Sequence, residues 1–311
     1  MTKIAIIILN WNGAEDTLAC VSSVLRALEN TKLQSVTGRV MVVDNGSRDA
    51  DLHKLKRGLA DVAAQCPEVK PELERVERNL GFAAGMNVGI RRICNWRPDF
   101  FWLLNNDTVI DIQAISALLS YSIYRPDAVM LGCTMVEQSS ERLLTAGGYR
   151  YFRWLGWNKP CLSGRALPDL NGLPTDRRMD YIDGAALWLR GNFIQLVGGI
   201  PQQYFLYFEE LELNHYVGPG ESIAWCPAAL VYHRQGGSSS NANLQARAAY
   251  HAAFSAFVYT QRHYRYCLPT VVLARLAGIG GKALIRRQPQ LLTAVLRAFL
   301  DFMTGRQASD F

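Results

Sequence analysis

The sequence has no long apolar run and no cysteine pairing pattern. None of its apolar stretches reaches the ~18 residues of a membrane-spanning helix, and the early run Ile4 to Leu9 is too short for the core of a secretion signal. The seven cysteines are odd in number, scattered and free of any CxxC spacing. This pattern argues against a zinc site or a disulfide framework. We therefore expect a cytoplasmic protein with reduced thiols, either soluble or peripheral at the inner face of the cell membrane.

Charge is sparse and unevenly placed. Charged residues make up 19% of the 311 residues and hydrophobic residues 49%, which excludes a disordered chain and allows one large domain with an appendage. The net charge is +6, yet residues 262–306 hold eight Lys and Arg against the single acid Asp301, a net charge of +7. The basic character therefore belongs to the C-terminal tail. Because this tail has no recognisable nucleic-acid motif, we expect no nucleic-acid partner.

Strand-like and helical patterns alternate along the first half of the chain, as in an α/β sheet. The pattern predicts strands at 4–9, 39–43, 75–77 and 100–104, and a helix at 15–28. Three of these strands are followed by polar clusters that begin at Asn10, Asp44 and Asn105. In an open α/β sheet, ligands bind outside the carboxyl ends of the strands. We therefore expect the three clusters to converge on one edge.

The second half is less regular. The pattern predicts a strand at 181–190, an aromatic strand or turn at 204–208, a helix from Glu209, a strand at 224–232 and a loop at 233–240. We divide the chain into a domain at 1–245 and a helical segment at 246–311, which Pro269 and Pro289 interrupt. One stripe of this segment holds Leu292, Val295, Leu296, Phe299 and Met303. Such a basic amphipathic segment either packs as a helical hairpin or lies on a membrane surface, and both interpretations stay open.

Asp107 is the first candidate for a metal ligand. It closes the segment Asn105-Asn106-Asp107 directly after a buried strand. Mg²⁺ commonly uses one or two carboxylates and completes its coordination with water and phosphate oxygens. One aspartate therefore suffices to suggest a metal and diphosphate site, whereas an isolated cluster of this kind would be a simple turn.

Seven short motifs follow one another in an order that resembles a known family. They read NWNG, VVDNGS, NLGFAAGMNVG, LLNND, DGAALWLR, YFLYFEE and HRQGGSS. Together they resemble the inverting glycosyltransferases of family 2, in particular a rhamnosyltransferase-like bacterial branch, over about residues 3–240. The resemblance implies a GT-A fold, an α/β architecture with a Rossmann-like mixed sheet flanked by helices, followed here by a C-terminal amphipathic helical segment.

The resemblance also implies the donor site. Asp44 would accept the ring N–H of a uracil or thymine base, although an aspartate here also suits the cap of a turn. Asn10, Trp11 and Asn106 would line the nucleotide pocket. The glycines of NLGFAAGMNVG do not form GxGxxG and favour helix packing. At the entrance of that helix, Asn79 and Gly81 would meet the donor through backbone N–H groups.

The resemblance further implies the metal and catalytic residues. Asp107 and His233 would hold Mg²⁺ or Mn²⁺, although the first aspartate of the family's metal motif is replaced by Asn105. The family's acidic pair reads Glu209-Glu210 here. Glu210 would be the catalytic base, with Glu209 and Asp183 on the acceptor side. Without the resemblance, these glutamates would be interpreted as an acidic first helical turn facing the helix dipole.

These residues predict sugar transfer from a dTDP- or UDP-sugar, with L-rhamnose from dTDP-rhamnose as the preferred donor. The acceptor would be a hydroxyl of a glycan or a polyprenyl-diphosphate-linked sugar in surface polysaccharide synthesis. A sugar-phosphate nucleotidyltransferase is the first alternative, but it needs a basic loop after the first strand, and NWNG has no cation. A non-catalytic nucleotide-sugar-binding assembly protein is the second, since the missing aspartate and the Glu-for-Asp exchange both permit it.

Overall fold

The fold is built around the strand at Thr2–Asn10, whose alternate side chains face the same helical layer. The computed structural model describes residues 1–31, 35–167, 178–234, 242–285 and 288–306. Strand β1 (Thr2–Asn10) contains the predicted apolar run and pairs in parallel with β2 (Val36–Asn45) and β4 (Phe100–Asn105). The strands predicted at 4–9, 39–43 and 100–104 are therefore confirmed.

The large sheet is mixed, as the α/β prediction requires. Its strand order is β3-β2-β1-β4-β11-β6-β12-β5, with β7 paired to β6. The further strands are β3 (Glu72–Val76), β5 (Thr108–Ile110), β6 (Ala128–Glu137), β7 (Leu143–Ala146), β11 (Ala186–Arg190) and β12 (Ser222–His233). β11 runs antiparallel to both β4 and β6, whereas β12 is parallel to β6.

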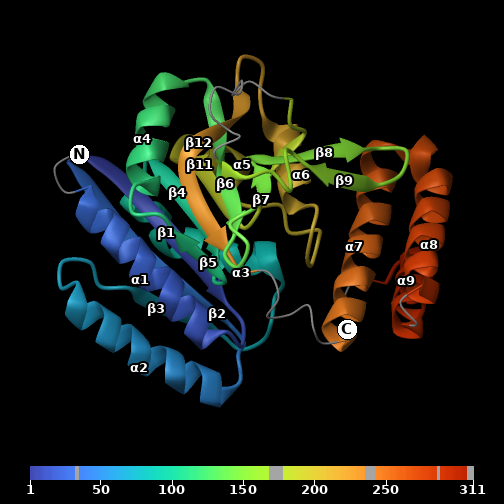
Figure 1. Ribbon diagram of the computed structural model, residues 1–311, viewed down its shortest axis with the longest axis horizontal. Helices are drawn as coiled ribbons and strands as arrows, with labels where there is room; N and C mark the ends of the chain where they lie inside the picture. The colour runs from blue at the N-terminus through green and yellow to red at the C-terminus, as the bar shows by residue number, and fades with distance from the viewer. Residues whose placement is uncertain (32–34, 168–177, 235–241, 286–287, 307–311) are drawn as a thin grey trace.

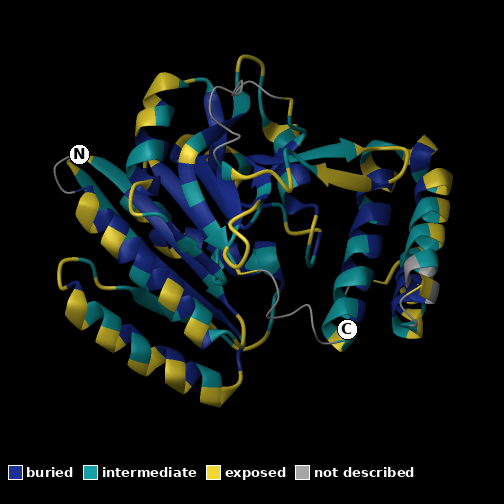
Figure 2. Cartoon of the chain, in the orientation of Figure 1, coloured by how far each residue is buried: buried dark blue, intermediate teal, exposed yellow. Residues whose placement is uncertain are grey.

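Helices cover both faces of this sheet (Figure 1). Because successive side chains of a strand point to opposite faces, Ile4, Ile6 and Ile8 join one buried cluster and Ala5 and Ile7 join another. The first cluster includes α1 (Ala14–Asn30), α2 (Asp49–Gln65) and α4 (Ala114–Tyr124), and the second includes α3 (Phe82–Ile93) and α5 (Gly191–Val197). Figure 2 shows the buried strands between these helical layers. The helix predicted at 15–28 lies within α1.

A small second sheet branches off at Asp183. It consists of β10 (Tyr181–Ile182), β8 (Gly148–Phe152) and β9 (Trp157–Pro160), all antiparallel. The single strand predicted at 181–190 is therefore wrong, because β10 belongs to this sheet and β11 to the large one. The chain turns between them where Asp183 Oδ1 accepts the N–H of Ala185 at 3.0 Å, a turn that aspartate side chains commonly stabilise.

The C-terminal helices share a core with the short helix α6 (Glu209–Leu213). They are α7 (Ala242–His263), α8 (Leu268–Ile285) and α9 (Pro289–Met303), so the breaks predicted at Pro269 and Pro289 are confirmed. One cluster of buried side chains joins these helices to the segment before and within α6, and includes Tyr204, Phe208 and Leu211. Residues 204–208 form a bend and not a strand.

The tail packs through a face adjacent to the predicted one. The buried residues of α9 are Leu291, Ala294, Val295, Ala298 and Asp301, whereas Leu296 and Met303 of the predicted stripe are exposed. The predicted domain boundary at 245 falls within α7, and the division into two units stays a prediction. No helix in the described ranges is long and apolar enough to cross a membrane. All seven cysteines lie in the described ranges, and none of them forms a disulfide bond there.

Candidate active site

The polar ends of β1 and β2 meet in one hydrogen-bonded cluster centred on Asn10. Its Nδ2 donates to Asp44 Oδ1 at 2.9 Å, Ser47 Oγ at 3.1 Å and Asp51 Oδ2 at 3.2 Å. Its Oδ1 accepts the hydroxyl of Thr17 at 2.8 Å. Asn10 is fully buried. Both polar atoms of its amide are engaged within the protein, so Asn10 holds Asp44 in place.

Asp44 presents one carboxylate oxygen without a hydrogen bond. The residue is fully buried, and its Oδ2 has no hydrogen-bond partner among the described residues. The nearest cation is Arg75, whose Nε lies 4.0 Å away. A buried acceptor without a donor is costly in free energy. This oxygen is therefore suited to accept a ligand N–H, such as that of a pyrimidine ring.

Trp11 and Asn106 lie beside this cluster. Trp11 is 37% exposed, and the guanidinium carbon of Arg247 from α7 lies 4.7 Å from its ring centroid. The ring of Trp11 therefore lies at the surface and does not belong to the core. Asn106 Nδ2 donates to the carbonyl of Gly13 at 3.2 Å and to Thr17 Oγ1 at 3.1 Å, which ties the end of β4 to the start of α1.

The entrance of α3 is already occupied by internal hydrogen bonds. Gly81 N–H donates to Asn79 Oδ1 at 2.9 Å, and Phe82 N–H donates to the carbonyl of Phe205 at 2.9 Å. A Cβ on Gly81 would lie 2.3 Å from that same carbonyl oxygen, and its φ is +84°. Glycine is therefore required by a close approach of two backbones. Of the two residues predicted to meet the donor phosphates, Gly81 already uses its backbone N–H within the protein.

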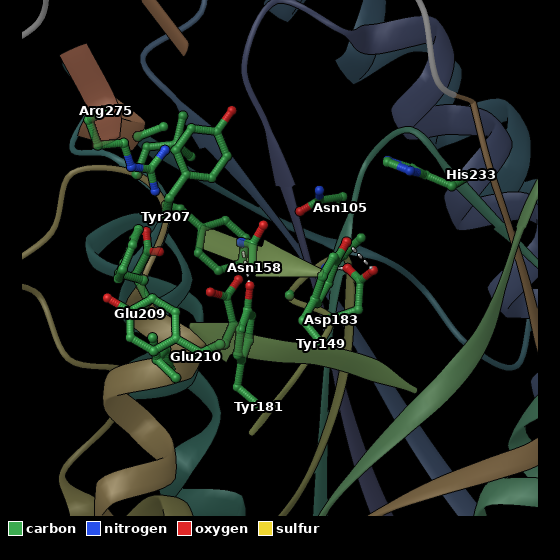
Figure 3. A pocket seen from close by; sticks show the side chains of 18 residues that line it. Asn105, Tyr149, Asn158, Tyr181, Asp183, Tyr207, Glu209, Glu210, His233 and Arg275 are labelled. Atoms are coloured by element: carbon green, nitrogen blue, oxygen red, sulfur yellow. Dashed lines mark hydrogen bonds between the residues drawn. The ribbon is translucent and has the colours of Figure 1, made fainter. Parts of the chain in front are cut away.

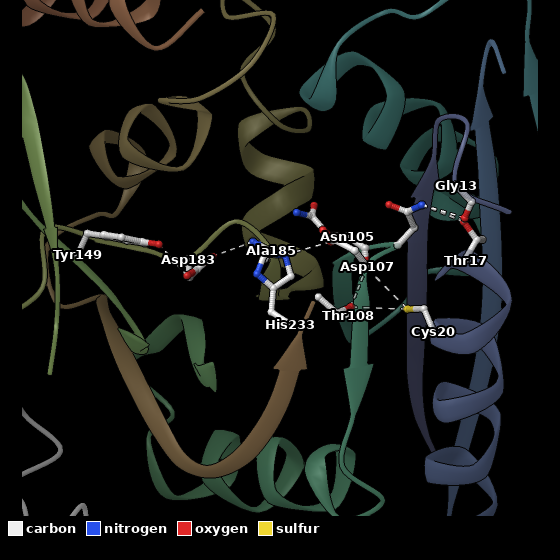
Figure 4. Close-up of polar contacts among 11 residues, drawn as sticks. Gly13, Thr17, Cys20, Asn105, Asp107, Thr108, Tyr149, Asp183, Ala185 and His233 are labelled. Carbon is white, nitrogen blue, oxygen red and sulfur yellow. Dashed lines mark hydrogen bonds and ion pairs between the residues drawn. The ribbon is translucent and has the colours of Figure 1, made fainter. Parts of the chain in front are cut away.

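Asp107 and His233 form a pair at the junction of β5 and β12 (Figure 4). His233 Nε2 lies 3.0 Å from Asp107 Oδ1, because β12 pairs His233 with Thr108 of β5. Burial lowers the pKa of His233, but the hydrogen bond and charge of Asp107 outweigh it and leave this pKa raised. The predicted metal ligands are thus brought together from positions 126 residues apart.

This pair fits a metal that shares its coordination with the substrate. Asp107 Oδ2 has no hydrogen bond from a described residue, so it is open to a cation. Among the described residues, no group of three or more His, Cys, Asp or Glu is arranged to hold a metal. A cation on Asp107 and His233 would therefore complete its coordination with water and diphosphate oxygens, as Mg²⁺ commonly does.

A cavity of about 410 Å³ extends from His233 of this pair to the acidic residues of α6 (Figure 3), while Asp107 lines a separate hollow together with Asn106. Its wall includes Phe82, Asn105, Tyr149, Tyr151, Asn158, Tyr181, Asp183, Gly184, Ala185, Leu206, Tyr207, Phe208, Glu209, Glu210, Leu211, His233, Ala252 and Arg275. His233 and Glu210 therefore face the same space. The predicted metal site and the predicted catalytic base are on one side of the molecule.

Glu210 is placed in this cavity by a strained turn and a glycine. Tyr207 and Phe208, directly before α6, both have left-handed φ angles of 69° and 75°, a strain that is typical of functional sites. A Cβ on Gly184 would lie 1.6 Å from Glu210 Oε1, so only glycine admits the carboxylate here. Burial raises the pKa of Glu210 to about 7, with a smaller contribution from the charge of Asp183.

Asp183 is held rigidly beside Glu210. Its Oδ2 accepts the hydroxyl of Tyr149 at 3.0 Å, while its Oδ1 accepts the N–H of Ala185. The ring of Tyr149 stacks on that of Tyr181 with centroids 5.2 Å apart. Burial raises the pKa of Asp183. Two carboxylates and two stacked rings therefore line the central part of the cavity.

Glu209, predicted on the acceptor side, is fully buried. Neither of its carboxylate oxygens has a hydrogen-bond partner among the described residues. Burial raises the pKa of Glu209 well above its usual value of 4.5, and the neighbouring charge of Glu210 raises it further. Glu209 therefore holds its proton more tightly in the folded protein than in the unfolded chain.

Glu209→Gln is expected to stabilise the protein at pH 8. A raised pKa in the folded state means that stability falls as pH rises above 4.5, the value of the unfolded chain. Glutamine does not ionise, so the variant does not lose stability as the pH rises. Its melting temperature should therefore exceed that of the wild type by a few degrees, since 1 kcal/mol corresponds to roughly 2–4 °C at this size. The difference should vanish below pH 4.5 in thermal melts. Equal melting temperatures at pH 8 would contradict the raised pKa of the buried Glu209.

Several cavity residues are not predicted by the sequence. Tyr149 and Tyr151 belong to an irregular region with aromatic interruptions. Asn158 comes from the adjacent strand, and Arg275 comes from α8 in the tail. The tyrosines do carry a signal in the sequence, because alternating aromatic residues predict a strand face. A single arginine in the apolar segment LPTVVLARLAGIGG carries none.

The chain is similar to known proteins in sequence. The profile described as Glycosyl transferase family 2 matches residues 5–167, slightly more than half of the chain. The N-acetylglucosaminyl-diphospho-decaprenol L-rhamnosyltransferase of Mycobacterium tuberculosis is 26% identical over 243 residues, which cover 72% of this chain and 75% of that protein.

Solved structures share the fold at low sequence identity. TarS 1–349 from S. aureus has a TM-score of 0.55 and 13% identity, covering 97% of this chain and 81% of its own. The mannosyltransferase PcManGT from Pyrobaculum calidifontis, in complex with GDP-Man and Mn²⁺, has a TM-score of 0.54 and 14% identity over 98% of this chain and 88% of its own. The mixed sheet flanked by helices is thus a GT-A fold. With the profile match, this shows that the chain belongs to glycosyl transferase family 2.

Proposed function

We propose that the protein is an inverting, metal-assisted hexosyltransferase. It moves L-rhamnose from dTDP-rhamnose to a hydroxyl of a glycan carried on a lipid diphosphate. The observation that carries this proposal is the single cavity in which Glu210 and Asp183 face the end of the sheet where His233 pairs with Asp107. The end of the cavity at His233 suits a diphosphate, and the part beside Glu210 suits an alcohol.

The reaction assigns a separate task to each group. The acceptor oxygen attacks the anomeric carbon while the bond from that carbon to the diphosphate breaks on the opposite face, and the hydroxyl proton passes to Glu210. A pKa of about 7 lets Glu210 accept this proton near neutral pH. Asp183, fixed by Tyr149 and Ala185, orients the hydroxyl. A divalent cation on Asp107 and His233 would neutralise the charge that develops on the leaving diphosphate.

The choice of donor rests on two different grounds. The unpaired Oδ2 of Asp44 supports a base with a ring N–H, which both thymine and uracil carry. The sugar is inferred from the rhamnosyltransferase of M. tuberculosis, whose acceptor is a sugar on a lipid diphosphate. The geometry therefore supports the nucleotide class, and the relative supports the sugar.

The test is a screen of nucleotide-sugar turnover by the full chain. dTDP-rhamnose, UDP-GlcNAc and GDP-mannose would each be incubated with Mn²⁺, Mg²⁺ or a chelator, and the released nucleotide measured. We expect metal-stimulated release, fastest from dTDP-rhamnose, and a transferred sugar of inverted anomeric configuration by NMR. Retention of configuration, or no release from any donor, would refute the proposal.

Asp44→Asn is expected to weaken dTDP binding by roughly 10-fold or more, because the replacement removes a charged acceptor for the ring N–H. Isothermal titration with dTDP measures this directly. A diphosphate ester without a base should bind wild type and variant equally. Loss of affinity for both compounds would assign Asp44 a purely structural role.

An exposed apolar surface near the tail supports contact with a membrane. In the β8–β9 hairpin, Trp154 is 55% exposed and Leu155 is 42% exposed. This hairpin is attached to α8, because Thr270 Oγ1 donates to the carbonyl of Trp154 at 2.8 Å. Arg153 and Arg265 lie beside it, and both line the same surface hollow as Trp154. Exposed aromatic and basic side chains together are typical of membrane interfaces.

We therefore expect the protein to sediment with anionic vesicles, and less so at high salt. A Trp154→Glu, Leu155→Glu double variant should lose most of this binding while its melting temperature stays unchanged, because both side chains are exposed. Exchange of the exposed Leu196 on α5 for Glu serves as the matched control. Equal sedimentation of the double variant and the wild type would argue against this surface.

A further inference from the structure

The cavity extends past Glu210 to a cation supplied by the C-terminal helices. Arg275 of α8 lines it together with Tyr151, Asn158 and Tyr181. Figure 3 shows Arg275 and His233 on opposite sides, with Glu210 and Tyr181 in the region between them. The cavity thus has two cationic or metal-binding ends and a carboxylate in its middle.

Arg275 has an incomplete set of partners. One of its terminal nitrogens, Nη2, donates to the carbonyl of Gly156. Its Nε is buried and has no hydrogen-bond partner among the described residues. Within the same residues, no Asp or Glu oxygen lies within 4.0 Å of its guanidinium. A buried cation without a counterion is unfavourable, so this position is suited to an anionic ligand.

The surroundings keep this cation charged and accessible from the cavity. Burial lowers the pKa of Arg275 to about 10, and the nearby hydroxyls of Tyr151 and Tyr181 act in the opposite direction. The guanidinium is therefore still protonated at neutral pH. The hydrogen bond from Arg275 to the carbonyl of Gly156 in the β8–β9 hairpin fixes the plane of the guanidinium group. A fixed plane favours bidentate binding of phosphate oxygens.

The location decides which anion is bound. The donor diphosphate belongs at the other end of the cavity, beside Asp107 and His233. Glu210 lies between the donor end of the cavity and Arg275. An anionic group bound at Arg275 therefore belongs to the acceptor, whose hydroxyl Glu210 deprotonates. The stacked rings of Tyr149 and Tyr181 lie between and offer a flat apolar surface for a sugar ring.

We propose that Arg275 binds the diphosphate of the lipid-linked acceptor, so that α8 forms part of the acceptor site. The inference rests on the proposed function, because it takes the acceptor to be a sugar on a diphosphate. Arg275 then selects acceptors by their charge and sets the distance from the diphosphate to the reacting hydroxyl. The C-terminal helices are therefore part of the specificity of the enzyme.

Binding to the full chain, without donor or metal, tests this inference separately from the transferase activity. The two probes are N-acetylglucosamine diphosphate bearing a short alkyl chain and the octyl glycoside of N-acetylglucosamine, which lacks the diphosphate. We expect the diphosphate probe to bind the wild type more tightly. Arg275→Ala should weaken binding of the diphosphate probe by roughly 10- to 100-fold and leave binding of the glycoside unchanged.

Further variants separate recognition from folding. Arg275→Lys should retain part of the preference for the diphosphate probe, and Arg275→Gln, which keeps a donor for Gly156, should lose it with an unchanged melting temperature. Arg57→Ala, an exposed arginine of α2 outside the cavity, is the matched control. In transfer assays Arg275→Ala should raise the KM for the diphosphate acceptor with little change in kcat.

Two results would overturn the inference. Equal losses for both probes in Arg275→Ala and Arg275→Gln would assign the residue a structural role. Binding of inorganic diphosphate as tight as that of the sugar diphosphate, and equally dependent on Arg275, would indicate a site for free phosphate. If no donor is turned over but the binding preference persists, the proposed transferase function fails and the anion site remains.

Discussion

Glu210→Gln is expected to lower the rate of sugar transfer by roughly 10²- to 10⁴-fold, the usual contribution of a general base. Glutamine preserves the shape of the side chain beside Gly184 but cannot accept the acceptor's proton. The affinity for dTDP should not change, because Asp44 and Asp107 lie outside this contact. Single-turnover kinetics and isothermal titration with dTDP measure the two quantities.

The pH dependence provides an independent check on this role. The base form of Glu210 predominates above its pKa of about 7. The value of kcat/KM for the wild type should therefore rise about tenfold per pH unit below this point and level off above it. The residual activity of Glu210→Gln should lack this rise.

Glu74→Gln is a matched control, because Glu74 pairs with Arg92 on the surface and does not line the cavity. It should transfer sugar at the wild-type rate. A Glu210→Gln enzyme with more than half of the wild-type rate would exclude Glu210 as the base. If in addition dTDP still binds, the protein would be better described as a non-catalytic nucleotide-sugar-binding protein.

Asp107→Ala is expected to abolish the effect of Mn²⁺ on nucleotide binding and to reduce transfer by about 100-fold or more, since charge neutralisation by a metal contributes several kcal/mol. In the wild type, dTDP should bind more tightly with Mn²⁺ than with a chelator. In the variant the two affinities should be equal. Because Asp107 is partly exposed, the fold should tolerate the exchange.

The exposed Asp61 of α2 offers a matched control, and Asp61→Ala should retain the full effect of Mn²⁺. His233→Ala should weaken the effect of Mn²⁺ but leave part of it, because the carboxylate of Asp107 remains. If Mn²⁺ strengthens dTDP binding equally in Asp107→Ala and the wild type, the cation binds elsewhere. The diphosphate would then have to be placed at another part of the sheet edge.

The donor side of the site can be predicted from local sequence, whereas the acceptor side cannot. Asn10, Asp44 and Asp107 each lie within three residues of a strand end that hydrophobicity predicts, and parallel pairing then brings these ends together. The pairing of His233 with Asp107 depends on the family order of motifs, because it joins residues 126 positions apart in the sequence. No periodicity indicates such a contact.

Two errors have physical reasons. The segment 181–190 is apolar enough for one strand, but the carboxylate of Asp183 stabilises a turn that divides it between two sheets. The apolar stripe on α9 is displaced from the predicted one, because hydrophobicity alone does not indicate which neighbouring helix is contacted. Small residues, Ala294 and Ala298, face the helices, whereas the larger Leu296 is exposed. Leu291 and Val295 are buried beside these alanines, so the packed face combines small and large apolar side chains.

The core shared by α6 and the C-terminal helices constrains how the proposed acceptor site of this protein can change. Tyr204, Phe208 and Leu211 pack in the same cluster as α7, α8 and α9. A chimaera that receives only the tail of a relative would place foreign side chains against the segment that carries Glu210. A graft that exchanges residues 204–213 together with the tail keeps the two packed surfaces complementary. A change of the proposed acceptor site therefore requires that both segments be exchanged together.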